Sequence, residues 1–435
     1  MLKIYTPGPE FAPEYHYTAR VVFEVFLGAE VSILQGSNHS LWRIEHGSNF
    51  LELPNLFFPE HRKESFFDSG RIPDRAFLCD FPELGKSCAS VNSLPGKGLA
   101  GQDIFGTVFF LLTCFEEHLD YPRDEHDRLA SEATWLVRNS LQHRPVVDEL
   151  LEVLLFLLKG SGISISRRPA DYSFHYSCDV DCPAKWHGAG VPAQIRILLG
   201  ALKKRSWGGL KKRAAAMSRL EADPAFTFYW ILDVLEENGA KGAFYFKSGA
   251  SSARYDVLYS LESAWAKRLI HEVDGRGHEV GFHPSYMTVL DEELFKQEFR
   301  VLRQAFSGNI DGGRQHFLRF LGASTWRMWE ACDLRYDSTA GYSRKIGFKC
   351  GTAHEFPAYD LERRKELGLR ERPLLAMDVA FLNTNQTFSD MFDAVASIGN
   401  QVKKFGGNMT LLWHNSVFET EDRKELFTQL IKHLM

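Results

Sequence analysis

The sequence predicts an α/β protein whose mostly parallel sheet, either open or closed into a barrel, is surrounded by helices. The evidence lies beyond residue 165, where strand-like runs alternate with helical stretches. The clearest runs are YSFHYSCDVD (172–181), GAFYFKSG (242–249) and HEVGFH (278–283). Strands separated by helices of about 10–15 residues are typical of βα units. Catalytic groups are therefore expected at the carboxyl ends of these strands.

The composition is that of an ordinary globular protein, with 435 residues of which 44% are hydrophobic and 25% charged. It excludes fibrous and disordered classes and, at roughly 100–200 residues per domain, predicts two or three domains. The 51 basic and 56 acidic residues are interspersed and give a net charge of −5. Such a chain has no field strong enough to attract nucleic acid or anionic lipid, so neither is expected as a partner. No pattern in the sequence specifies an oligomeric state.

Three features predict a cytoplasmic protein. The amino terminus, MLKIYTPGPEF, reaches a proline and an acid before an apolar stretch builds up, unlike a secretory signal. The longest apolar runs, at 105–115 and 150–158, are about half the ~20 residues needed to span a bilayer, so no membrane span is expected. Seven cysteines scattered over a long chain suit a reducing compartment better than a disulfide framework.

The first third of the chain predicts a small α/β domain. A strand-like run at 2–6 precedes a helical pattern at 17–27 and a β-rich, aromatic stretch at 42–58. A Gly/Pro/Ser-rich connection, NSLPGKGLAGQ (92–102), then leads to an amphipathic helix for which Asp103 is the expected N-cap.

A second helix of this first third ends at Gly160. The polar segment that follows it predicts a boundary between an accessory domain, 1–165, and a catalytic domain, 166–435.

Two aspartates follow the first strand of the catalytic domain. Because alternate residues of an extended chain share a face, Asp179 and Asp181 can point the same way at the strand exit. Two such carboxylates could hold a hard metal, or one could hold a metal while the other acts as a base. The plainer interpretation is a pair of turn acids. Cys178 and Cys182 flank the pair and are interpreted as packing residues, since no second ligand pair for a zinc knuckle follows.

Three further segments carry polar groups that could meet these aspartates. His283 leaves a short strand next to a proline, where an imidazole is well placed as a ligand. Arg314 and His316 follow a Gly-Gly pair in a loop that can deliver several polar groups to one point. His414 ends an apolar strand, where a general acid or base can lie. Taken singly, each is more often a hydrogen-bonded structural residue or an ordinary surface turn.

Taken in order, these segments resemble the polysaccharide deacetylase superfamily, which includes chitin and peptidoglycan N-deacetylases. The resemblance covers roughly residues 170–430. GAFYFKSG, preceded by the helix LDVLEENG, is similar to the family's K-A-T-F-F-x-x-G strand, and GHEVGFH to its G-H-E-I-G-x-H strand. CDVD takes the place of T-F-D-D, and LLWHNS that of the closing L-x-H-D strand.

Further motifs resemble a divergent branch of that superfamily with an extra amino-terminal domain. They are GFHPSY, RQHFLRF, YDST, MDVAF and WHNS, with Cys178 in place of the branch's usual histidine. The resemblance implies a distorted (β/α) barrel, often seven-stranded, with a smaller N-terminal α/β domain. It also implies a divalent metal, expected to be zinc, held by one Asp and two His.

Carried over by position, the resemblance assigns Asp179 as catalytic base, Asp181 and His283 as metal ligands, and His414 as general acid. The second metal histidine should follow His283 by four residues, where this chain has Met287.

A thioether is a poor zinc ligand, so His316 is the first candidate for the missing ligand and His414 the second. Arg314 would then orient the base and lower its pKa. Tyr286, Trp413 and Tyr342 are candidate platforms for sugar rings.

The predicted function is a metal-dependent hydrolase that removes N-acetyl or O-acetyl groups from a sugar or polysaccharide precursor, attacking amide bonds other than peptide bonds. The expected partner is a carbohydrate, and the near-neutral charge suits an uncharged sugar. Without a secretory signal, an intracellular step of glycan assembly is expected. Two alternatives remain open: a non-catalytic deacetylase-like protein that binds glycans, favoured by Met287, and a D-x-D metal-dependent glycosyltransferase.

Overall fold

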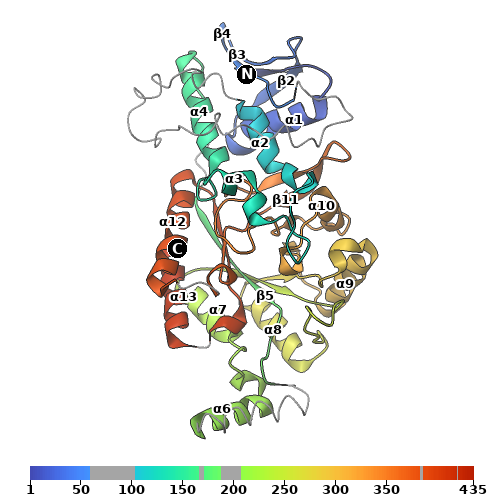
Figure 1. Ribbon diagram of the computed structural model, residues 1–435, viewed down its shortest axis with the longest axis vertical. Helices are drawn as coiled ribbons and strands as arrows, with labels where there is room; N and C mark the ends of the chain where they lie inside the picture. Colours follow the sequence, from blue (N-terminus) through green and yellow to red (C-terminus); the bar gives the residue numbers. More distant parts are fainter. Residues whose placement is uncertain (59–102, 166–170, 188–206, 383–385, 419) are drawn as a thin grey trace. The chain divides into compact units, whose positions relative to one another are not determined.

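The computed structural model describes residues 1–58, 103–165, 171–187, 207–382, 386–418 and 420–435 (Figure 1). Its contacts divide the chain into two compact units. The first unit comprises Met1–Tyr172, Leu318–Leu375 and Gln401–Asn408, and the second unit comprises Ser173–Phe317, Ala376–Asn400 and Met409–Met435.

The boundary proposed at residue 165 stays a prediction. The contacts also group residues 318–375 and 401–408, which the sequence placed in the catalytic domain, with the first unit. The connection predicted at 92–102 lies outside the described residues.

The first unit contains a four-stranded sheet of order β2-β1-β3-β4. Strand β1 pairs in parallel with β2 and antiparallel with β3, which in turn pairs antiparallel with β4. The strands are β1 (Leu2–Thr6), β2 (Val31–Gln35), β3 (Leu41–His46) and β4 (Asn49–Pro54). The predicted strand at 2–6 and the β-rich stretch after residue 41 are confirmed.

Helices and three further strands complete the first unit. They are α1 (Ala12–Arg20), η1 (Val21–Phe26), α2 (Ile104–Leu112), η7 (Phe115–His118), η8 (Ser131–Ala133), α3 (Trp135–Arg138), α4 (Val146–Gly160), α10 (Ala323–Glu330), β9 (Tyr336–Asp337), β10 (Phe356–Asp360) and β11 (Lys365–Glu371). The Asp103 side chain accepts a hydrogen bond from the Gly106 N–H, so the predicted N-cap of α2 is confirmed.

The second unit contains six strands in the order β8-β7-β6-β5-β13-β12. The pairs β5–β6, β6–β7, β7–β8 and β12–β13 are parallel. The strands are β5 (Ser173–Val180), β6 (Gly242–Phe246), β7 (Glu279–Phe282), β8 (Gly312–Gly313), β12 (Ala376–Met377) and β13 (Asn408–Leu412). The α/β class is confirmed. Closure into a seven-stranded barrel stays a prediction, because the described pairings form a row that does not join β8 to β12.

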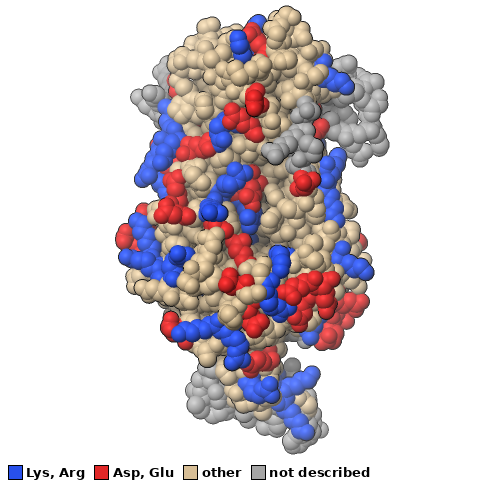
Figure 2. All heavy atoms as spheres, turned by 180° about the vertical axis from the view of Figure 1, so that it is seen from behind, with Lys and Arg blue, Asp and Glu red and all other residues tan. Residues whose placement is uncertain are grey.

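Helices lie between these strands along the chain, as the alternation predicted, and two more, η12 and α13, follow β13 (Figure 1). They are α6 (Trp207–Ser218), η9 (Leu220–Ala222), α7 (Phe228–Glu237), α8 (Ala264–Gly275), η10 (Thr288–Leu290), α9 (Glu292–Ala305), η11 (His316–Leu318), α11 (Val379–Leu382), α12 (Phe388–Phe405), η12 (Asn415–Val417) and α13 (Glu421–Leu434). Among the described residues, none of the helices is both long enough and apolar enough to cross a bilayer. Basic and acidic side chains adjoin one another at several places on the face shown in Figure 2.

The strand register aligns the residues that follow the strands. Val180 pairs with Phe246, Phe246 with Phe282, and Phe282 with Gly313. The next residues, Asp181, Lys247, His283 and Arg314, therefore leave the sheet side by side.

The last of these pairs requires a glycine. A Cβ on Gly313 would lie 1.8 Å from the carbonyl oxygen of Phe282. Only a residue without a side chain allows β7 and β8 to approach so closely.

Candidate metal centre

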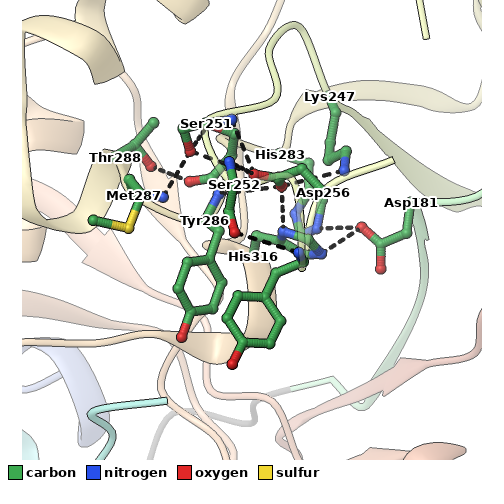
Figure 3. Close-up of polar contacts among 12 residues, drawn as sticks. Asp181, Lys247, Ser251, Ser252, Asp256, His283, Tyr286, Met287, Thr288 and His316 are labelled. Atoms are coloured by element: carbon green, nitrogen blue, oxygen red, sulfur yellow. Dashed lines mark hydrogen bonds and ion pairs between the residues drawn. The ribbon is translucent and has the colours of Figure 1, made fainter. Parts of the chain in front are cut away.

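Asp181, His283 and His316 converge at this edge of the second unit (Figure 3). Their candidate ligand atoms all lie within 4.8 Å of one another. The Nε2 atoms of His283 and His316 are 3.0 and 3.2 Å from Oδ1 of Asp181. Both histidines are buried, and the side chain of Asp181 is 28% exposed.

The backbone sets the tautomer of His283. Its Nδ1 lies 2.6 Å from the carbonyl oxygen of Arg314, which can only accept a hydrogen bond. Nδ1 therefore carries the hydrogen, and in the neutral ring the lone pair is on Nε2, facing Asp181.

A carboxylate sets the tautomer of His316 in the same way. Its Nδ1 lies 2.8 Å from Oδ1 of Asp256. Burial would raise the pKa of Asp256, but its contacts with His316 and with the Lys247 ammonium hold that pKa below its usual range, so Asp256 is an anion that accepts. The Nε2 lone pair of His316 then also faces Asp181.

This arrangement fits a metal ion. Two imidazole lone pairs and a carboxylate oxygen repel one another unless a proton or a cation lies between them. Within the described residues, neither Asp181 Oδ1 nor His283 Nε2 makes a hydrogen bond of acceptable geometry, although both are buried. Two imidazole nitrogens and one carboxylate oxygen are a usual donor set for a catalytic zinc site.

Without a metal ion, protons would have to lie between the carboxylate and the imidazole nitrogens to offset their repulsion. Burial disfavours a charged His316, but the adjacent Asp181 and Asp256 raise its pKa. Correspondingly, His316 and His283 hold the pKa of Asp181 well below its usual range, against the effect of burial.

Asp179 lies beside the three ligands and is held by Arg314. The guanidinium Nη1 donates to Oδ1 of Asp179 and to Oγ of Ser177, both at 2.9 Å. The other carboxylate oxygen, Oδ2, is 3.9 Å from Nε2 of His283. Arg314 and Asp179 are 0% and 3% exposed. The geometry thus leaves one oxygen of Asp179 facing the candidate metal ligands.

His414 approaches from β13, on the side of the other Asp181 oxygen. Its Nε2 is 3.6 Å from Oδ2 of Asp181, and its Nδ1 is 2.8 Å from Oδ1 of Asp378. Burial alone would lower the pKa of His414, but the Asp378 carboxylate, helped by Asp181 and Asp179, raises it to about 10. A pKa raised this far keeps a hydrogen on Nε2 at neutral pH, which leaves that nitrogen no free lone pair.

Met287 takes no part in the candidate site. Its side chain is 38% exposed and points away from the histidines in Figure 3. Its backbone N–H donates to Oγ of Ser251 at 2.8 Å.

The three aromatic residues proposed as sugar platforms are packed. Tyr286 is 7% exposed and stacks on Tyr255 with ring centroids 4.3 Å apart. Trp413 is 4% exposed and packs near Phe427. Tyr342 is 3% exposed and belongs to the first unit, unlike the other predicted site residues. Their contact with a sugar stays a prediction.

Sequence reasoning missed the residues that support this site, chiefly Asp256, Lys247 and Asp378. Asp378 lies in the MDVAF segment directly after β12, so its place at a strand end was an available signal. Asp256 lies in a loop after β6, where no periodic pattern marks it. Cys178 is buried and Cys182 partly buried, and both are free thiols, as expected.

Residues 2–162 match the model of a family of unknown function, DUF7033. No curated protein matches the chain.

Part of the chain is similar to solved structures, including the following three. A putative polysaccharide deacetylase from Mycobacterium smegmatis is 14% identical, with a TM-score of 0.40 over 61% of this chain and 84% of its own. A probable polysaccharide deacetylase from Pseudomonas aeruginosa PAO1 is 12% identical, with a TM-score of 0.39 over 61% and 85%. PuuE allantoinase is 10% identical, with a TM-score of 0.40 over 61% and 84%.

Proposed function

We propose that this protein is a metal-dependent hydrolase that removes acetyl groups, chiefly from the amide nitrogen of an N-acetylated sugar. One observation supports it most directly: a carboxylate, Asp179, and a second imidazole, His414, both lie within 4 Å of the Asp181–His283–His316 cluster. Metal-assisted amide hydrolysis combines a Lewis acid, a base and an acid in this way.

The cation would be held by Asp181, His283 and His316, with zinc the best match to these donors. When bound, it would supply Lewis-acid polarisation of the acetyl carbonyl and of the attacking water.

The base in this proposal is Asp179. Arg314 occupies its Oδ1 and fixes the plane of the carboxylate, so that Oδ2 is left to accept a proton from water at the cluster. Arg314 is itself held by Ser177 Oγ, so the carboxylate has little freedom to turn.

The acid is His414. Because Nδ1 is bonded to Asp378, the Nε2–H is directed to the Asp181 side of the site. An imidazolium with a pKa raised to about 10 can give this proton to the departing amine, which would otherwise be too basic to leave.

The two alternatives have weaker support. A D-x-D glycosyltransferase would present both aspartates to one cation, whereas here Arg314 holds Asp179. A non-catalytic glycan-binding protein would need no base and acid beside the cluster, and Met287 favours it less because His316 lies where it can supply the missing ligand.

Acetate release tests the proposal. Zinc-loaded protein is incubated with N-acetylglucosamine oligomers, peptidoglycan fragments and O-acetylated sugars, and acetate is measured. Activity should vanish after chelation and return with zinc. Asp179→Asn and His414→Asn should each lower kcat/KM by roughly 10²–10⁴-fold, the usual contribution of a general base or acid. Acetate release that is unchanged by Asp179→Asn or by metal removal would contradict the mechanism.

A further inference from the structure

Asp256 lies in the loop that follows β6 and contacts the Nδ1 side of the His316 ring, while Nε2 of that ring faces Asp181 (Figure 3). Its side chain is fully buried. Oδ1 contacts Nδ1 of His316 at 2.8 Å and Nζ of Lys247 at 3.3 Å. Oδ2 accepts hydrogen bonds from the backbone N–H groups of Ser251 and Ser252 at 3.0 and 2.9 Å. These contacts leave the carboxylate little freedom to turn away from the imidazole.

The same carboxylate joins three loops that follow neighbouring strands. The N–H of Tyr286, in the turn after β7, is 3.2 Å from both Asp256 oxygens. His316 follows β8, and Asp256 itself follows β6. One buried anion thus fixes the spacing of the segments that carry His283 and His316.

The backbone after His316 is also constrained. Phe317 has a φ of 59° and a ψ of 16°, a left-handed conformation that bulky residues rarely adopt. Its ring packs edge-on against Tyr255 and Tyr286, with both centroid distances 5.5 Å. This packing holds the unfavourable turn in place and thereby orients His316.

We propose that Asp256 is a positioning residue that makes His316 a metal ligand and sets the affinity of the site. The inference rests on the cation site of the proposed function. A carboxylate bonded to Nδ1 orients the ring and makes Nε2 a stronger ligand, and loss of such a partner typically weakens metal binding by 10–100-fold. His316 comes from the loop after β8 and not from the turn after His283. The orientation of its ring therefore depends on the contact with Asp256.

Zinc affinity of the full chain tests the proposal without relying on catalysis. The metal-free protein competes for zinc with a chromogenic chelator, and its thermal unfolding midpoint is measured in parallel. Asp256→Asn should weaken zinc binding by about 10–100-fold.

Asp223→Asn is the matched control. Asp223 is also buried, at 3% exposure, and accepts hydrogen bonds from the backbone of Lys185, Trp186 and His187. It bonds to none of the three ligands, so this variant should keep its zinc affinity within about threefold of wild type, well inside the effect of losing a ligand's partner. A merely structural role of Asp256 would lower the unfolding midpoint and leave the affinity unchanged.

A second variant keeps the test decisive if Asp256→Asn does not fold. Asp256→Glu retains the negative charge beside Lys247 but moves it by one methylene, so its zinc affinity should fall between those of Asp256→Asn and wild type. Wild-type affinity in either folded variant overturns the positioning role and leaves the proposed function intact. Absence of zinc binding by the wild-type chain overturns both.

Discussion

At the scale of single residues, the candidate site depends on which histidine completes the ligand set. Position 287, where the motif predicts the second ligand, holds an exposed methionine that points away. His316 instead reaches Asp181 from the loop after β8. In the candidate site, a histidine from the loop after β8 thus takes the place that the motif gives to residue 287.

Two substitutions test this exchange. His316→Gln should lower zinc affinity by about 100-fold or more, because one of three protein ligands is lost. Met287→His should keep the zinc affinity within about threefold of wild type, because the side chain at 287 is partly exposed and points away from the three candidate ligands. Chelator competition measures the zinc affinity of both variants. Tighter zinc binding by Met287→His would show that a side chain at position 287 can reach the metal.

Arg314 is the second residue on which the site depends. Replacing it with methionine leaves the buried Asp179 carboxylate unpaired, which typically costs about 3–5 kcal/mol and should lower the midpoint of thermal unfolding by roughly 6–20 °C.

Arg276→Met is the control for this variant. Arg276 also binds two carboxylates, Asp233 and Glu236, but near the surface, where such pairs contribute about 1 kcal/mol or less. Equal midpoints for Arg314→Met and Arg276→Met, measured by circular dichroism, would contradict the assigned burial of the Asp179–Arg314 pair.

At the scale of elements, the strand register assembles the site. The alignment of Val180, Phe246, Phe282 and Gly313 places the following residues of β5, β6, β7 and β8 in one row. The Phe282 carbonyl accepts the Arg314 N–H at 3.1 Å, so the β7–β8 pairing also positions Arg314.

Gly313→Ala tests the register. Its Cβ would lie 1.8 Å from the Phe282 carbonyl oxygen, a backbone atom that cannot move without separating the strands. Both the unfolding midpoint and the zinc affinity should fall, the affinity by about tenfold or more as Arg314 and His316 are displaced.

Gly275→Ala, at the end of α8, is the matched control for Gly313→Ala. A Cβ there meets nothing within 4 Å. It should leave zinc affinity unchanged and raise stability by roughly 0.5–1 kcal/mol, because alanine favours a helix over glycine. Wild-type zinc affinity of Gly313→Ala would argue against the close approach of β7 and β8.

At the scale of the whole molecule, both units bury ionisable carboxylates. In the second unit, Asp179 contacts Arg314, and Asp256 contacts Lys247 and His316. In the first unit, Glu116 is 8% exposed and accepts a hydrogen bond from the Trp135 N–H. Burial raises the pKa of Glu116 to about 7.

This shift makes the stability of the first unit depend on pH. The folded state binds the Glu116 proton more tightly than the unfolded chain, so the favourable contribution is present below pH 4.5 and is lost as the pH rises to about 7. Glu116→Gln removes this dependence. The free energy of unfolding of Glu116→Gln, relative to that of wild type, should therefore rise by about 3 kcal/mol between pH 4.5 and pH 7. This free energy corresponds to the rise in the pKa of Glu116.

Urea unfolding at several pH values measures this effect. Glu132→Gln is the control, because the side chain of Glu132 is 73% exposed and should show no such dependence. Parallel pH curves for Glu116→Gln and wild type would rule out the raised pKa.

The sequence by itself determined the features that depend on neighbouring residues along the chain. The alternation of strands and helices predicted the α/β class, and capping chemistry predicted Asp103 at the start of α2. Strand-end placement singled out Asp181, His283 and His414, because a residue that ends a buried strand is carried to the edge of the sheet wherever the strand lies. His316 was a candidate because of its Gly-Gly loop and because the resemblance left one ligand missing at Met287.

Only the tertiary structure decided which of these side chains meet and what supports them. The contacts of Asp256 with His316 and of Asp378 with His414 join residues 60 and 36 positions apart. No local pattern encodes such pairs, because they depend on strand order, register and the path of the loops. The same reason applies to residues 318–375, which follow the candidate site in sequence but pack with the first unit.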